Sequence, residues 1–111
     1  MKKVFLCLTL VLALPLLARA ETWNGVPFVD SNCFAKVKAD PDSHTRECAL
    51  ACAKSGFGII ASDGTFLKFD ASGNKKALAL LKETSKKDHL RVTVTGKRNA
   101  DTIEVDSIKL D

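Results

Sequence analysis

Three observations predict a mainly β domain with two short helices (α+β), arranged as an OB-like five-stranded partly open barrel with a helical insertion between strands 1 and 2. Five short β-favouring runs follow the first twenty residues, and a helix-favouring run separates the third from the fourth. The connection after the first strand is long and carries every cysteine that follows residue 20. This order is typical of the OB plan. An open α+β sandwich and a small SH3-like barrel are the alternatives.

Residues 1–20 have the layout of a secretory signal peptide. The segment opens with two lysines, continues through an almost wholly apolar run at 4–17, and ends in Ala-Arg-Ala at 18–20. The apolar run is shorter than the ~20 residues of a membrane-spanning helix. We therefore expect cleavage after Ala20, a single domain over residues 21–111, and a secreted or periplasmic protein with no membrane anchor after cleavage.

The charge of the mature chain does not indicate a nucleic-acid partner. Removing residues 1–20 takes away Lys2, Lys3 and Arg19, which lowers the Lys and Arg count from 17 to 14 against 13 Asp and Glu. The net charge falls from +4 to +1. Nucleic-acid binding depends on many contacts between basic side chains and phosphates, so this balance gives no support for it.

The first strand is expected over residues 21–30, where Pro27 indicates an edge or a bulge. Residues 31–43 should form a loop that ends in turn-favouring Asp and Ser. A helix is expected over 43–55 because alanines favour it and Gly56 can terminate it.

The second half of the chain supplies four more strands and one helix. Strands are expected over 56–61 and 65–70, joined by a tight turn. Residues 70–74 contain turn-favouring residues, and 75–83 favour a helix with its leucines inward. The clean alternation of 89–96 predicts a half-buried strand. The last strand is expected over 102–110, where the alternation changes phase near Ile108 as it would at a β-bulge.

A cysteine and histidine cluster is the main candidate for chemistry. His44, Cys48 and Cys52 stand four residues apart on the expected helix, so they form one stripe. Two thiolates at that spacing can hold one ion, and Cys33 can complete the set from the end of the first strand. A Cys₃His set is typical of structural zinc and is acceptable to copper. Zinc or copper is therefore the candidate cofactor at Cys33, His44, Cys48 and Cys52.

A disulfide is the competing interpretation. Cysteines of an exported chain can be oxidised, and three cysteines leave one unpaired. Cys33 bonded to Cys48 or to Cys52 would clip the loop to the helix, which stabilises a fold by about 3 kcal/mol in the chain-entropy model. Buried filler cysteine is a third interpretation.

An enzyme is not expected. His44 and Cys48 resemble a base and nucleophile pair, but the sequence supplies no orienting acid or oxyanion site. Trp23 and Phe28 are a weak candidate ligand surface on the barrel face, although such residues are more often core. The partner is unknown, with an envelope protein or a glycan as candidates.

The sequence also resembles a group of small exported bacterial proteins of unknown function with an OB-like fold and a three-cysteine pattern. The resemblance covers nearly the whole mature chain and rests on these motifs: GVPFVDSNC (25–33), DPDSHTRECALACAKSGFGI (40–59), DGTFLKFD (63–70), VTVTG (92–96) and IEVDSI (103–108). The group carries no established activity, so the function is inferred from the residues themselves. We expect a secreted or periplasmic binding or accessory module of the cell envelope, whose ligand is a soft metal ion at the cysteine and histidine cluster or a partner or glycan at the barrel face. The alternative is a disulfide-stabilised structural or protein-interaction module with no small-molecule site.

Overall fold

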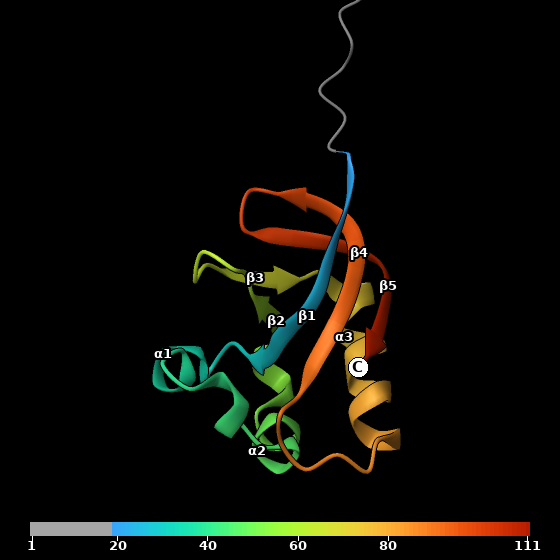
Figure 1. Cartoon of the computed structure of the whole chain (residues 1–111). Helices are drawn as coiled ribbons and strands as arrows, with labels where there is room; N and C mark the ends of the chain where they lie inside the picture. The colour runs from blue at the N-terminus through green and yellow to red at the C-terminus, as the bar shows by residue number, and fades with distance from the viewer. Residues whose placement is uncertain (1–18) are drawn as a thin grey trace, which may run out of the picture.

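The computed structural model describes residues 19–111, so the expected signal peptide lies almost wholly outside the described residues. Ten elements follow one another (Figure 1): β1 (Ala20–Asp30), α1 (Phe34–Val37), a 3-10 turn (Pro41–Ser43), α2 (Arg46–Ala51), a second 3-10 turn (Ala53–Ser55), β2 (Phe57–Ile60), β3 (Phe66–Phe69), α3 (Ala71–Glu83), β4 (Arg91–Asn99) and β5 (Thr102–Leu110).

The five strands form a closed barrel in the order β1-β2-β3-β5-β4, with β4 pairing back onto β1. Only β3 and β5 are parallel neighbours, through Lys68 with Thr102 and Phe69 with Ile103. The OB-like, mainly β prediction is confirmed, including the insertion between strands 1 and 2, but the barrel is closed where a partly open one was expected, and three α-helices form instead of two. Figure 1 shows α1 and α2 at one end of the barrel and the β4–β5 turn at the other.

β1 is irregular near the expected proline, but the extra residue lies just before it. The register of β1 against β4 shifts between Trp23 and Val26, and Gly25 between them has a φ of 59°. Glycine adopts that left-handed conformation without strain. Pro27 is the last residue of β1 paired with β4, and Phe28 begins the pairing with β2. Proline, which cannot donate a hydrogen bond, therefore stands where the strand changes partner.

β5 contains the bulge that its change of phase predicted. Thr95 pairs with Ser107 and the next residue, Gly96, pairs with Val105, so Asp106 is the extra residue. The bulge changes which side chains of β5 face inward, because the alternation restarts after the extra residue. Ile103 and Val105 before it are buried.

α3 is longer than expected, because the predicted turn at 70–74 is its first turn. The Asp70 carboxylate caps the helix by accepting a hydrogen bond from the Gly73 N–H at 2.9 Å. The prediction of a turn was wrong for a physical reason. Asp, Ser, Gly and Asn favour turns and helix N-termini alike, since both use short polar side chains to satisfy free backbone groups.

The hydrophobic core fills the interior of the barrel and extends to the places where α2 and α3 pack against it. Its aromatic centre is Phe28, whose ring lies 5.2 Å from that of Phe57 and 6.2 Å from that of Phe69. The remaining buried residues of the cluster are aliphatic: Ala49, Ile59, Leu67, Ala77, Leu81, Leu90, Val92, Val94, Ile103 and Val105. The prediction that Leu78, Leu80 and Leu81 all face inward is only partly right. Leu81 alone of the three is fully buried.

The insertion departs most from the prediction. The single helix expected over 43–55 is a short α2 with a 3-10 turn on each side, and α1 forms in the expected loop. α2 begins late because Thr45 caps it, its hydroxyl accepting from the Cys48 N–H at 3.1 Å. Thr45 is a preferred capping residue in the extended conformation that a cap requires.

Polar contacts fasten the insertion to the barrel. Arg91 of β4 donates to both carboxylate oxygens of Asp42 at 3.1 Å, a bidentate pair. Arg46 donates from Nε to the Leu81 carbonyl at the end of α3 at 2.6 Å. His44 contacts β1 through Asp30. Three separate side-chain links therefore hold the insertion without a bond between sulfurs.

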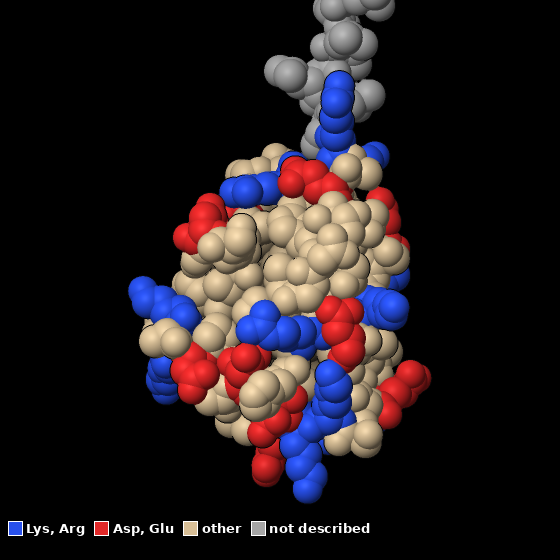
Figure 2. Space-filling view, in the orientation of Figure 1, with Lys and Arg blue, Asp and Glu red and all other residues tan. Residues whose placement is uncertain are grey.

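The described surface is mixed in charge. Figure 2 shows Lys and Arg interspersed with Asp and Glu around an uncharged central area on the visible face. Within residues 19–111, no helix has the length and apolar character needed to cross a bilayer.

Candidate functional site

The candidate site begins with a turn at the end of β1. Asp30 is its last residue and is completely buried. The chain turns through Ser31 and Asn32, and the Cys33 N–H donates to Asp30 Oδ2 at 3.0 Å. This contact closes the turn that leads into α1, whose N-cap is Cys33. The same turn places the Cys33 side chain beside the Asp30 carboxylate.

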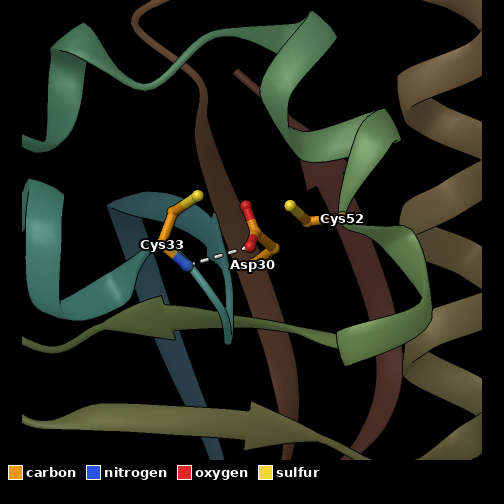
Figure 3. Close-up of side chains that lie close together, drawn as sticks. All are labelled: Asp30, Cys33 and Cys52. Carbon is orange, nitrogen blue, oxygen red and sulfur yellow. Dashed lines mark hydrogen bonds between the residues drawn. The ribbon is translucent and has the colours of Figure 1, made fainter.

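Cys52 reaches the same point from the far end of the insertion. It is the C-cap of α2, where the helix ends and a 3-10 turn begins. One carboxylate oxygen of Asp30 and the sulfurs of Cys33 and Cys52 all lie within 4.8 Å of one another. Figure 3 shows the Asp30 side chain between the two cysteines. The Asn32 amide also donates to Cys52 Sγ at 3.8 Å.

His44 belongs to this site through Asp30. Its ring is buried, and Nε2 lies 2.6 Å from Asp30 Oδ1. Nδ1 is also buried and has no hydrogen-bond partner among the described residues. Oδ1 of Asp30 thus contacts His44 Nε2, and Oδ2 accepts a hydrogen bond from the Cys33 N–H. These two contacts fix the orientation of its carboxylate.

Cys48 stands apart from the site. Its side chain is exposed on α2, and it is not part of the three-residue cluster. The predicted stripe of His44, Cys48 and Cys52 needs a continuous helix, and α2 instead begins after His44 and ends before Cys52. The structure therefore brings together Cys33 and Cys52, adds His44 as a partner of Asp30, and leaves Cys48 outside.

Asp30 was missed as a site residue. A signal for it exists in the sequence, because an acidic residue ends an apolar strand three positions before a cysteine. That spacing lets a carboxylate bond the cysteine N–H in a turn, which also brings the two side chains together.

The aromatic ligand surface does not form as expected. Phe28 is only 2 % exposed and stacks in the core, so it is not available at the barrel surface. Trp23 is partly buried on β1 and packs against the core cluster. Both side chains pack in or against the core, as large aromatic side chains commonly do.

Among residues 19–111, Cys33, Cys48 and Cys52 are free thiols. Of the two pairings that the sequence left open, Cys33 with Cys52 is the one that proximity supports, since both sulfurs belong to the cluster. Either an ion held between them or a bond joining them is chemically consistent with this arrangement.

The surroundings of Cys33 oppose its ionisation. Burial, followed by the charge of Asp30 and its hydrogen bond and then by Cys52, raises the pKa of the Cys33 thiol from 9.0 to about 11. A thiol is a nucleophile and a metal ligand only as thiolate. Cys33 is therefore a poor nucleophile at neutral pH, which argues against a thiol enzyme built on it.

This pKa predicts a loss of stability in alkali for the ion-free protein. Between pH 9.0 and about 11 the unfolded chain loses the Cys33 proton and the folded chain keeps it, so the free energy of unfolding falls as pH rises. Below pH 9.0 this contribution is complete. We expect the melting temperature of Cys33→Ser to fall less than that of the wild type as the pH rises from 9.0 to about 11. Circular dichroism at a series of pH values measures this. A parallel decline in wild type and variant would contradict the assignment.

Comparison with known proteins gives no relative: no family model, curated protein or solved structure matches the chain.

Proposed function

We propose that the chain is an exported binding module of the cell envelope that holds a zinc ion between Asp30, Cys33 and Cys52. One observation carries the proposal: a buried carboxylate and two thiols, from segments on either side of the insertion, converge within 4.8 Å. Thiolate sulfur and carboxylate oxygen are both common ligands of zinc. The proposed compartment rests on the signal-peptide layout of residues 1–20, and the likeness to small exported bacterial proteins rests on the sequence motifs alone.

The position of the two thiols supports a role as ligands. The insertion is already held by Asp42 with Arg91, Arg46 with the Leu81 carbonyl, and His44 with Asp30. The sulfurs are therefore not needed as its attachment. They meet where an anionic carboxylate opposes ionisation of Cys33, and a bound cation would reverse that effect by favouring the thiolate.

The donor set favours zinc over copper. Monovalent copper prefers soft sulfur ligands alone, whereas zinc accepts sulfur together with carboxylate oxygen. His44 contributes as an outer partner that orients the Asp30 carboxylate, as ligand carboxylates commonly require. Three protein ligands leave one position of a tetrahedral zinc for a solvent molecule or a donor from an envelope partner.

Metal binding is tested on reduced protein with single cysteine variants. We expect one Zn²⁺ per chain by native mass spectrometry, and a thiolate charge-transfer band when Co²⁺ replaces it. Cys33→Ser and Cys52→Ser should each weaken Zn²⁺ binding by at least about tenfold, because each removes a ligand. Cys48→Ser is the matched control and should bind as the wild type does. Equal loss in all three variants, or no binding by the wild type, would overturn the proposal.

A disulfide-stabilised interaction module is the second candidate, and the same proximity of sulfurs favours it. A Cys33–Cys52 bond would close a loop of about twenty residues and add about 3 kcal/mol in the chain-entropy model. Intact mass of the protein as isolated, with and without alkylation, separates the two. One disulfide that persists in every preparation, with no ion bound after reduction, would favour the structural module.

A further inference from the structure

Metal binding and disulfide formation would use the same pair of sulfurs in this protein. Cys33 and Cys52 lie within 4.8 Å of each other, so the atoms proposed to hold the ion are also the atoms that a disulfide would join. A sulfur in a disulfide has no thiolate charge to offer a metal ion. Ion binding and disulfide formation at this site are therefore mutually exclusive.

The fold lets the site change between these forms locally. Cys33 is the N-cap of α1 and Cys52 is the C-cap of α2, so both stand at the ends of short helices and not within a strand. Both side chains are partly exposed, which gives an oxidant access to them. The insertion stays attached through Asp42 and Arg91 in either form.

We propose that oxidation of Cys33 and Cys52 to a disulfide releases the bound ion, so that occupancy of the site follows the redox state of its surroundings. This inference rests on the proposed function and adds a control to the same site. The oxidant it requires is a low-molecular-weight disulfide, R–S–S–R.

The reaction proceeds by two thiol–disulfide exchanges. The Cys52 sulfur attacks one sulfur of R–S–S–R, a mixed disulfide forms at Cys52, and RS⁻ leaves. The Cys33 sulfur then attacks the Cys52 sulfur, the Cys33–Cys52 bond forms, and the second RS⁻ leaves. The two protein sulfurs give up two electrons, and the two RS⁻ groups take protons from the cysteine thiols or, in the ion-bound form, from water. The ion is released because both of its thiolate ligands have become disulfide sulfurs.

The surroundings of the two sulfurs set the order of attack. Asn32 donates to the sulfur of Cys52. The mixed disulfide is therefore expected at Cys52, and a Cys33→Ser variant should stop there and accumulate it.

The test uses purified reduced protein loaded with one equivalent of Zn²⁺ and then exposed to oxidised glutathione. Free Zn²⁺ is followed with a colorimetric chelator and the protein by intact mass. Cys48→Ser removes the exposed thiol outside the cluster and is the reference protein. We expect the mass of the Cys48→Ser protein to fall by two hydrogens and one Zn²⁺ to be released for each disulfide formed. A thiol reductant should reverse both changes. Bound Zn²⁺ should slow the oxidation at least about tenfold, because it occupies the thiolates.

The outcomes separate this inference from the function on which it rests. Zn²⁺ that binds and stays bound under oxidised glutathione would overturn the redox control and leave the metal site intact. A Cys33–Cys52 disulfide in a protein that never binds Zn²⁺ would overturn both. Release of Zn²⁺ from Cys48→Ser without a Cys33–Cys52 bond would show that glutathione capping, and not the disulfide, expels the ion.

Discussion

Replacing Asp30 with alanine should destabilise the ion-free protein by about 2–5 kcal/mol, because it takes away the hydrogen-bond partner of two groups and each group left unsatisfied costs about 1–3 kcal/mol. Asp30 is fully buried and holds His44 Nε2 at 2.6 Å and the Cys33 N–H at 3.0 Å. The variant leaves the buried His44 Nε2 and the partly buried Cys33 N–H without this partner, and an unpaired buried polar group keeps its full desolvation cost. Urea unfolding of reduced protein in the presence of a chelator measures the effect apart from any metal.

Two further variants give this prediction its controls. Asp106→Ala removes an exposed carboxylate and should change the stability by no more than about 0.5 kcal/mol. His44→Ala should cost much of what Asp30→Ala costs, and the double variant should cost less than the sum, because the two side chains are in direct contact. Additive losses, or a loss below about 1 kcal/mol for Asp30→Ala, would show that the pair does not support the fold.

Gly58→Ala should cost about 3 kcal/mol, at the upper end of the range for overpacking. Gly58 lies in β2 between β1 and β3, where it pairs with Val29 and Lys68. A Cβ at this position would press against the Leu67 carbonyl oxygen and lie 2.7 Å from Cζ of Phe66. The carbonyl belongs to the backbone of the neighbouring strand, so β3 itself would have to move.

The matched control is Gly64→Ala in the β2–β3 turn. Nothing lies within 4 Å of a Cβ there, but the φ of 88° is unfavourable for alanine. Its cost should therefore be only about 1 kcal/mol, the conformational part alone. The comparison is made by urea unfolding of both variants. Equal losses would mean that conformational strain, and not the close approach of two strands, is what Gly58 relieves.

The barrel was predictable because its signals are local. The alternation at 89–96 and 102–110 is a property of the strands themselves, and the change of phase near Ile108 marked a bulge that the structure places at Asp106. The start of α3 was not predictable in the same way. Asp70 to Asn74 are equally suited to a turn, and only the packing of the helix against β5 decides between the two.

The candidate site was predictable in part. The sequence predicted that Cys33 approaches either Cys48 or Cys52, and the structure places it beside Cys52. Cys48 was included because four-residue spacing implied one helix, and the Thr45 cap shortened that helix from its start. The contribution of Asp30 depends on a three-dimensional arrangement, since its two oxygens are used by groups three and fourteen residues away.

The order of the strands also determines when folding can be completed during synthesis. Ala20 at the start of β1 pairs with Lys97 of β4, and β3 pairs with Thr102 and Ile103 of β5. The first strand to leave the ribosome thus finds its longest partner only after most of the chain has emerged. Such separated pairings slow folding, so the barrel can close only after its last strands have been made.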